Sequence, residues 1–229
     1  MKVTLVDHMG SDLSVVNAAR VSFAKTSEWD VVPDAGPIEG YLRVDDERLI
    51  KYLAKHNHWS PFGHASMQFH IKAPVFVARQ LVKHQIGLVW NEISRRYVDT
   101  EPEFYEVDKW RGKPIDKKQG SDGEVEKQGS CYYSQQMVEN TAKIAYNSLL
   151  NAGVAPEQAR MVLPQSLMTE WYWSGSLYAF ARVCNLRCAK DSQYETRLIA
   201  NEIDKQCEIK FPVSWKELRT WVEKDTQNT

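Results

Sequence analysis

Polar and apolar residues alternate one by one in Ser66–Lys72, which is typical of a strand with one buried face. In Asp45–His56 the apolar residues Leu49, Ile50 and Leu53 instead fall on one face at helical spacing. The chain therefore mixes strands and helices, which predicts an α+β fold without internal repeats. Further strands are predicted at Val3–Asp7 and Leu167–Trp173, and further helices at Asp12–Arg20, Tyr132–Ala152, Leu177–Leu186, Ser192–Cys207 and Trp215–Val222.

Turn-forming and capping residues set the expected boundaries of these elements. Ser11 or Asp12 can cap the first helix, because both side chains accept hydrogen bonds from free N–H groups. Trp29–Tyr41 contains two Pro and two Gly, so we expect a loop or a lid. Gly112–Gly129 is polar and glycine-rich, which predicts a flexible surface excursion. Residues 1–229 are therefore treated as one domain with a polar insertion at about residues 106–130.

Residues 79–97 combine charged and amide side chains with enough apolar residues to be buried. Guanidinium and ammonium groups carry positive charge and donors suited to phosphate. Asn91, Glu92 and Ser94 can bind the polar edge of the molecule that carries the phosphate. A solvated helix face would alternate Glu and Lys, whereas this segment has one acid together with His84. We therefore interpret it as an anion-binding segment.

The same segment is expected to begin as a helix and to end as a loop. Pro74 suits the first helical position, because its missing N–H costs nothing there, and Gly87 is expected to end the helix. Leu88–Tyr97 then forms a loop or a short extended segment that folds back over the helix end. Two polar pairs are expected one turn apart, Arg79 with Lys83 and Gln80 with His84.

Composition restricts the classes of protein to which the chain can belong. The 229 residues, 43% of them hydrophobic, can bury a core. Because 29 basic residues face 30 acidic ones, we expect no nucleic-acid partner, since nucleic-acid-binding modules usually carry a basic surplus. No stretch approaches the length of a membrane-spanning helix, and Asp7 comes too early for a secretory signal. The four cysteines form no disulfide framework either, so we expect a cytoplasmic protein without a membrane partner.

Two groups of possible metal ligands are present in the sequence. Cys184 and Cys188 lie one helical turn apart, but without neighbouring histidines they are interpreted as packing residues. Four histidines fall within fifteen residues, yet the surrounding acids lie upstream on the preceding predicted helix, too far away to complete a metal shell. We therefore predict no metal site. The histidines are His56, His58, His64 and His70.

Part of the anion-binding segment resembles the signature of the flavin-dependent thymidylate synthases, Arg-His-Arg, a short spacer and Asn-Glu-x-Ser-x-Arg-Tyr. Here the triplet is Lys83-His84-Gln85, and the second block is Asn91–Tyr97. The spacer is one residue longer than the common form, and Val89 stands where many relatives carry a serine. Lys83 lacks the two-pronged donor of an arginine, and Gln85 lacks its charge. We therefore expect the phosphates of the flavin or the nucleotide to be bound differently here than in relatives with Arg-His-Arg. Further segments before and after the signature also resemble the family and occur in the same order as in its members: Val6–Ser14, Ala18–Phe23, His58–His64, Lys72–Gln80, Ala159–Pro164 and Asn185–Arg187.

This resemblance implies both a fold and an activity. The family has a central, mostly antiparallel sheet flanked by long helices. Its members convert deoxyuridylate (dUMP) to thymidylate with FAD, NADPH and methylenetetrahydrofolate, without a cysteine nucleophile. They are homotetramers whose active sites lie at subunit junctions. We therefore expect FAD as the cofactor, nucleotide and folate as small-molecule substrates, and a homotetramer.

Matching the motifs residue by residue implies roles for individual side chains. In the family pattern Arg187 lies against the uracil ring, where its permanent charge would stabilise negative charge on the ring and make C5 nucleophilic. Ser176 and Arg182 stand where relatives often have asparagine. The dUMP site would comprise Gln80, Lys83, Glu92, Ser94, Arg95, Arg96, Arg160 and Arg187. The FAD site would comprise Ser60, Lys83, His84, Gln85, Glu92, Ser176 and Arg182.

Other functions fit parts of the same pattern. A flavin-dependent pyrimidine-nucleotide hydroxymethylase would use the same phosphate-binding residues. A non-catalytic nucleotide-binding relative would have lost its chemistry with the two arginines, although Glu92, Ser94, Arg96 and Arg187 together favour an active enzyme. A metal-dependent nucleotide hydrolase would use the histidine cluster. Because Cys188 lies next to Arg187, a mechanism in which its thiolate attacks the pyrimidine stays open. The flavin-dependent reaction that the resemblance implies needs no thiol.

Overall fold

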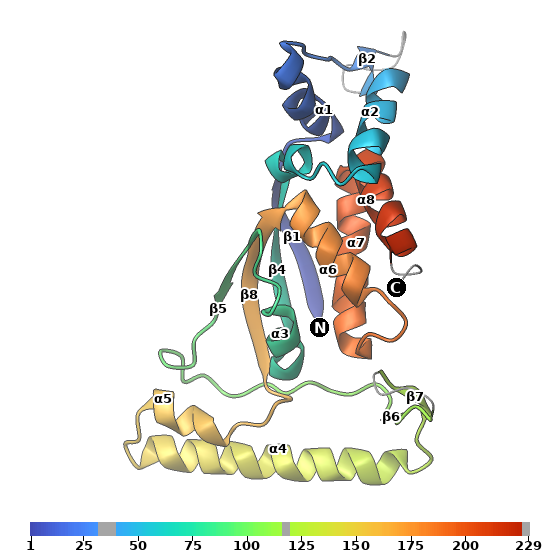
Figure 1. Cartoon of the computed structure of the whole chain (residues 1–229). Helices are drawn as coiled ribbons and strands as arrows, with labels where there is room; N and C mark the ends of the chain where they lie inside the picture. The colour runs from blue at the N-terminus through green and yellow to red at the C-terminus, as the bar shows by residue number, and fades with distance from the viewer. Residues whose placement is uncertain (32–39, 116–119, 226–229) are drawn as a thin grey trace.

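A computed structural model of the protein describes residues 1–31, 40–115 and 120–225. At its centre lies a four-stranded sheet in which neighbouring strands are antiparallel. Helices cover one face of this sheet, and further helices lie beyond its two ends (Figure 1). The predicted α+β fold with a central antiparallel sheet is confirmed. In spatial order the strands are β1 (Lys2–Met9), β4 (Ser66–Pro74), β8 (Met168–Ser176) and β5 (Leu88–Glu92).

The two central strands, β4 and β8, bury alternate side chains. Met67, Phe69 and Ile71 of β4 are buried, whereas the residues between them are partly exposed. Phe69 pairs across the sheet with Trp173 of β8 and packs edge-on against Phe180, with ring centroids 5.1 Å apart. Because successive side chains of a strand point to opposite faces, one face of the sheet forms the core.

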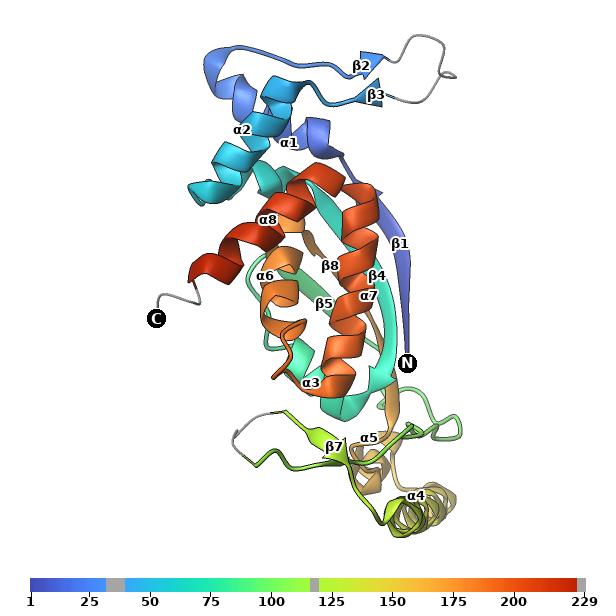
Figure 2. The same ribbon diagram turned by 90° about the vertical axis from the view of Figure 1, so that its right-hand side faces the viewer.

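Three C-terminal helices cover this apolar face (Figures 1 and 2). Helix α6 (Leu177–Arg187) follows β8 directly and lies beside α7 (Tyr194–Lys210). Helix α8 (Pro212–Asp225) packs against both of them. Val183 and Ile203 are fully buried between the layers, as the predicted helical periodicity requires.

The N-terminal helices lie beyond one end of the sheet, at the top of Figure 1. Ser11 is the N-cap of the first of them, as predicted. Asp12 has a different role, because its buried carboxylate accepts hydrogen bonds from the backbone N–H groups of Val213 and Ser214 at 2.9 and 2.8 Å. Asp12 therefore joins the start of the first helix to the start of α8. The two helices are α1 (Asp12–Arg20) and α2 (Val44–Lys55).

The long helix α4 (Gln128–Asn151) lies beyond the opposite end of the sheet, beside the short helix α5 (Pro156–Ala159) (Figure 1). Only Ala142 and Tyr146 of α4 are buried. Neither α4 nor any other helix in the described ranges is apolar enough over a sufficient length to cross a membrane. The described part of the chain also contains three 3₁₀ helices: η1 (Val21–Phe23), η2 (Ser60–His64) and η3 (Arg160–Val162).

Helix α3 (Val75–Leu81) is shorter than predicted. Pro74 is its N-cap rather than its first residue, and the helix ends well before Gly87, which was its expected end. Tertiary structure explains the difference, because the chain has to turn before Leu88 can pair with Gly175 of β8. Gly87 lies in this turn with a φ of +75°, a conformation that favours glycine.

The early end of α3 also changes the surroundings of the polar residues that follow it. Lys83 and His84 lie in the turn after the helix, so the predicted one-turn pairs with Arg79 and Gln80 are wrong. The extended segment predicted beyond Gly87 is confirmed, because β5 is an edge strand of the sheet and residues 93–97 form a loop.

The described residues of the predicted excursion at Gly112–Gly129 lie at the surface, but they contain regular structure that was not predicted; residues 116–119 lie outside the described residues. A short hairpin of β6 (Arg111–Gly112) and β7 (Asp122–Glu124) is followed by α4, which begins within this range. Arg111 forms an ion pair with Glu195 and lies 3.8 Å from the ring centre of Tyr194, which ties the hairpin to α7. A polar composition does not reveal such an anchor.

The loop or lid predicted at Trp29–Tyr41 is bounded by two short strands. β2 (Asp30–Val31) pairs with β3 (Gly40–Tyr41). Residues 32–39 of this prediction lie outside the described residues.

Candidate functional site

The turn after α3 and one side of α6 enclose a recess of about 340 Å³. Lys83, His84 and Gln85 enter it from the turn, and Arg182 enters it from the helix. Two cations and no carboxylate line the recess, so it favours an anionic ligand. Its apolar wall consists of Ile86, Leu88, Ala179 and Leu186.

A hydrogen bond joins this turn to the end of α6. Arg187 Nε donates to His84 Nε2 at 2.9 Å. Burial, together with the positive charges of Arg187 and Arg182, lowers the pKa of His84 to about 4. His84 is therefore neutral at pH 7, with its ring proton on Nδ1. Burial also lowers the pKa of Arg187, but a guanidinium stays charged.

Two glycines allow the turn and the start of α6 to approach each other. A Cβ atom on Gly175 would lie 2.5 Å from the carbonyl oxygen of Gly87, and a Cβ atom on Gly87 would lie 3.1 Å from Ala179 Cβ. Ser176 caps α6, since its Oγ accepts a hydrogen bond from the Ala179 N–H at 3.2 Å. The predicted FAD residue Ser176 thus caps α6 and does not line the recess.

A second cavity, of about 400 Å³, lies at the other end of β5. It is lined by Glu92, Arg95 and Arg160, all of them predicted dUMP residues. Glu92 Oε1 accepts a hydrogen bond from the Thr169 hydroxyl at 2.6 Å, and Arg95 Nη1 donates to the Thr100 carbonyl at 2.8 Å. The first contact holds Glu92 against β8, and the second holds Arg95 against the loop that follows β5.

The predicted FAD residue Ser60 lines a third cavity, of about 600 Å³, between α1, α2 and η2. Tyr178 of α6 donates a hydrogen bond to Asn57 Oδ1 at 2.7 Å, and its ring lies 6.3 Å from that of Trp59. The start of α6 therefore connects the turn at Ser60 with the neighbourhood of Ser176.

The remaining predicted residues do not enter the recess. Gln80 accepts a hydrogen bond from the Thr196 hydroxyl of α7 at 2.5 Å. Arg96 Nε donates to Ser94 Oγ at 3.3 Å in the loop after β5. Within one chain, the structure thus brings together Lys83, His84, Gln85, Arg182 and Arg187, and separately Glu92, Arg95 and Arg160.

Sequence reasoning missed the apolar wall of the recess. Ala179, Arg182 and Leu186 recur at intervals of three and four residues, which places them on one face of α6. This spacing is visible in the sequence, but it does not show which neighbour the face meets.

Comparisons with known proteins identify the family of the chain. Residues 4–213 match the family described as "Thymidylate synthase complementing protein". The flavin-dependent thymidylate synthase of Thermus thermophilus is 40% identical over 214 residues, which cover 93% of this chain and 73% of that protein. This chain belongs to the flavin-dependent thymidylate synthase family. The family member from Thermosipho africanus is 38% identical, over 90% of this chain and 87% of that protein.

Solved structures give the same result for the fold. The UMP/dUMP methylase PolB from Streptomyces cacaoi, bound with 5-Br dUMP, superposes with a TM-score of 0.79 at 31% identity. The match covers 94% of this chain and 93% of that one. A PolB structure bound with 5-Br UMP superposes with a TM-score of 0.78. The chain therefore has both the sequence and the fold of this family.

Proposed function

We propose that the protein converts dUMP to thymidylate by reductive methylation at C5, with methylenetetrahydrofolate as carbon donor and FAD and NADPH as the reducing system. Family membership supports this proposal. The observation that carries it is the hydrogen bond between Arg187 and His84. This bond joins the end of α6 to the turn after α3, which contains Lys83-His84-Gln85 and lines the cationic recess. No step in this scheme uses a cysteine nucleophile.

Arg187 is the proposed catalytic residue. Its Nε is held by the neutral His84, which orients the guanidinium plane and leaves the two Nη groups for a ligand. Directed at a uracil ring, those groups stabilise negative charge on N3 and the carbonyl oxygens and so raise the nucleophilicity of C5. Arginine suits this role because it keeps its proton throughout.

The recess fits the phosphate part of a flavin dinucleotide. Lys83 and Arg182 supply two cations, Gln85 supplies amide donors, and no carboxylate in the lining repels a diphosphate. When bound, the flavin supplies the hydride that completes the methyl group. Four further residues complete the proposed FAD contacts: His84, Ser176, Ser60 and Glu92.

The proposed nucleotide residues lie in several places of one chain, which favours a site built from more than one subunit. Glu92, Arg95 and Arg160 line their own cavity, whereas Lys83 lines the recess at the other end of β5. We propose a cytoplasmic homotetramer in which these parts meet across subunit contacts. The full dUMP set is Gln80, Lys83, Glu92, Ser94, Arg95, Arg96, Arg160 and Arg187.

Tritium release tests this function. Purified protein is incubated with dUMP labelled at C5, methylenetetrahydrofolate, NADPH and FAD, and the released label is counted. We expect release that depends on all three additions, together with yellow protein after FAD is added. A colourless protein that takes up no FAD and releases no tritium would refute the proposal.

The variant Arg187→Ala tests whether Arg187 acts in the reaction step or only in dUMP binding. We expect about a hundredfold slower tritium release, the scale for one preorganised donor, with a smaller change in dUMP affinity. Arg48→Ala is the matched control, because Arg48 is an exposed arginine paired with Asp45 on α2. Equal rates of tritium release in Arg187→Ala and Arg48→Ala would show that Arg187 is not the catalytic residue.

A second candidate substrate is UMP, which we include because PolB is named as a UMP/dUMP methylase. The same assay with C5-labelled UMP compares the two nucleotides directly. Mass spectrometry of the products distinguishes a methyl group from a hydroxymethyl group at C5, and so separates methylation from the alternative hydroxymethylase function.

A further inference from the structure

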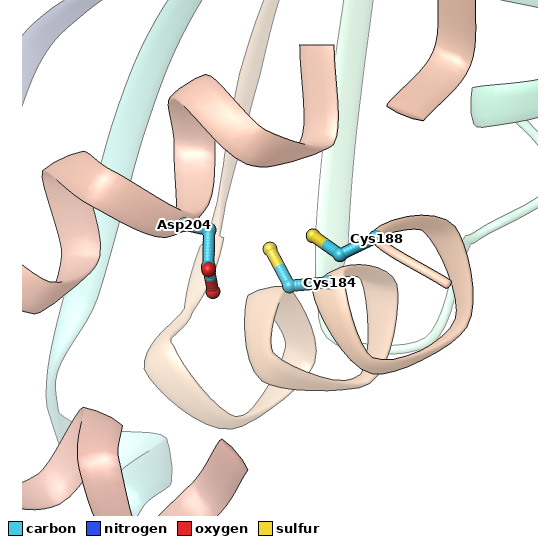
Figure 3. Close-up of side chains that lie close together, drawn as sticks. All are labelled: Cys184, Cys188 and Asp204. Carbon is cyan, nitrogen blue, oxygen red and sulfur yellow. The ribbon is translucent and has the colours of Figure 1, made fainter. Parts of the chain in front are cut away.

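Three side chains with metal-binding atoms meet between α6 and α7 (Figure 3), and none of them lines the recess. Cys184 lies in the last turn of α6, Cys188 directly follows the helix as its C-cap, and Asp204 faces both from α7. Their two sulfur atoms and a carboxylate oxygen all lie within 4.8 Å of one another. Cys184 is buried, whereas Cys188 and Asp204 are partly exposed, so an ion can reach the cluster from the solvent side.

The spacing of the two cysteines favours a bridging ion over a disulfide bond. Residues four apart on a helix have Cβ atoms about 5–6 Å apart. A disulfide needs Cβ atoms only about 3.5–4.5 Å apart, so a Cys184–Cys188 bond would require the last helical turn to unwind. An ion bound between two sulfur atoms, each at about 2.3 Å, tolerates the wider spacing.

One carboxylate oxygen of Asp204, Oδ2, has no hydrogen-bond partner among the described residues. Trp215 Nε1 donates to Asp204 Oδ1 at 2.9 Å, and Arg219 Nε lies 2.8 Å from the same oxygen. Both contacts orient the carboxylate, and neither uses Oδ2. Asp204 is therefore held in place by two partners while one oxygen stays available.

We propose that Cys184, Cys188 and Asp204 bind a divalent ion of the Zn²⁺ type, with water in the fourth position. Each thiol loses a proton to water, two metal–sulfur bonds and one metal–oxygen bond form, and no electrons are transferred. The ion and its three anionic ligands carry one net negative charge, which the adjacent Arg219 balances. Thiolate sulfur and carboxylate oxygen are established zinc ligands.

Such an ion would fasten the end of α6 to α7. The proposed ligand Cys188 directly follows Arg187, so a bound ion would also restrict the motion of the helix end that carries this arginine. Because the folded chain holds the three ligand atoms within 4.8 Å of one another, it would bind the ion more tightly than the unfolded chain, so saturation should raise the melting temperature.

A metal titration of the reduced, full-length protein tests the proposal. Metal-free protein is titrated with Co²⁺, whose tetrahedral thiolate complexes are coloured, and Zn²⁺ is then added to displace it. We expect one ion per chain and a release of about two protons per ion, measured calorimetrically in two buffers. Zn²⁺ should also raise the melting temperature. No coloured complex, or proton release near zero, would overturn the assignment.

Variants identify the ligands. Cys188→Ser and Asp204→Asn should each weaken Zn²⁺ binding at least about tenfold and abolish the rise in melting temperature. Cys131→Ser is the matched control, because Cys131 is a free cysteine on α4. Since Asp204→Asn also disturbs the contact with Arg219, Cys188→Ser is the decisive variant. Unchanged binding in Cys188→Ser, or loss of binding in Cys131→Ser, would refute the site.

Discussion

At the level of single residues, the chemistry of the recess depends on the protonation state of one histidine. His84 can accept the Arg187 Nε–H only through an unprotonated Nε2. Burial and two neighbouring arginines favour this neutral form, which explains why the pKa of His84 falls to about 4. A cationic His84 would repel Arg187 and lose the hydrogen bond that orients it.

This dependence predicts a loss of stability in mild acid. The unfolded chain protonates His84 below about pH 6.5, whereas the folded protein does so only near pH 4. The stabilisation is therefore fully present above pH 6.5 and is lost as the pH falls towards 4. Because the ring is only half-buried, we expect an effect on the order of 1 kcal/mol after solvent screening.

Urea unfolding at several pH values measures this effect. The free energy of unfolding should fall more steeply between pH 6.5 and 4 in the wild type than in His84→Gln, whose amide oxygen can still accept from Arg187. Equal slopes in the two proteins would mean that His84 is not held neutral by the fold.

Lys83 carries a second prediction at the residue level. It lines the recess as one of two cations, so Lys83→Ala should weaken dUMP or FAD binding by about tenfold or more, the range for a charged hydrogen bond. Lys83→Arg should retain or tighten binding, because it restores the forked donor. Lys216→Ala, at an exposed position on α8, is the control in equilibrium binding measurements. Unchanged affinity in Lys83→Ala would show that Lys83 does not bind the phosphate, and would assign this contact to Arg95, Arg96 and Arg160.

Among the secondary-structure elements, the edge strand β5 connects two cavities. Its first residue lies beside the recess, and its last residue, Glu92, lines the second cavity. The strand keeps this position by pairing with β8, where Leu88 is opposite Gly175. The close approach at this pair leaves no room for a side chain on Gly175.

Gly175→Ala should therefore displace the start of β5. The new Cβ would lie 2.5 Å from both the Gly87 carbonyl oxygen and Leu88 Cδ2, and a backbone carbonyl cannot rotate away. We expect a loss of about 1–3 kcal/mol of unfolding free energy, together with weaker FAD binding. Gly129→Ala on α4 is the control, since a Cβ there meets nothing within 4 Å. Wild-type stability in Gly175→Ala would show that β5 adapts without cost.

In the molecule as a whole, α4 lacks a partner within the described residues that covers its apolar side chains. Tyr133, Met137 and Ile144 are 69, 53 and 71% exposed, and Met161 near the end of α5 is 81% exposed. Tyr133, Met137 and Ile144 recur at intervals of four and seven residues, which places them on one face of α4, and an exposed apolar face of this kind commonly marks a subunit contact. It supports the proposed homotetramer, in which distant parts of different chains complete one site.

A charge placed on this surface should separate the subunits. Ile144→Asp is expected to shift the protein from tetramer to smaller species in light scattering and to lower tritium release in parallel, because a buried unpaired charge is costly at an interface. Ile209→Asp, at an isoleucine of α7 that is 67% exposed, is the matched control. A tetramer that survives Ile144→Asp with full activity would place the subunit contact elsewhere.

Local patterns in the sequence were sufficient to predict the α+β class and most strands and helices. These properties depend on local periodicity and on motifs that are contiguous in the chain. The short span of α3 has a non-local cause, because β5 must pair with β8. The same holds for the hairpin in the polar insertion, which Arg111 anchors to Glu195 over a separation of 84 residues.

Packing between elements, by contrast, determines which side chains meet. His84 and Arg187 are 103 residues apart, and no local pattern shows that one accepts a hydrogen bond from the other. Cys184 and Cys188 lacked a third ligand until the packing of α7 against α6 placed Asp204 beside them. The physical reason is common to both cases: hydrogen bonds and metal coordination act over a few ångströms, and only the tertiary structure brings distant residues within that range.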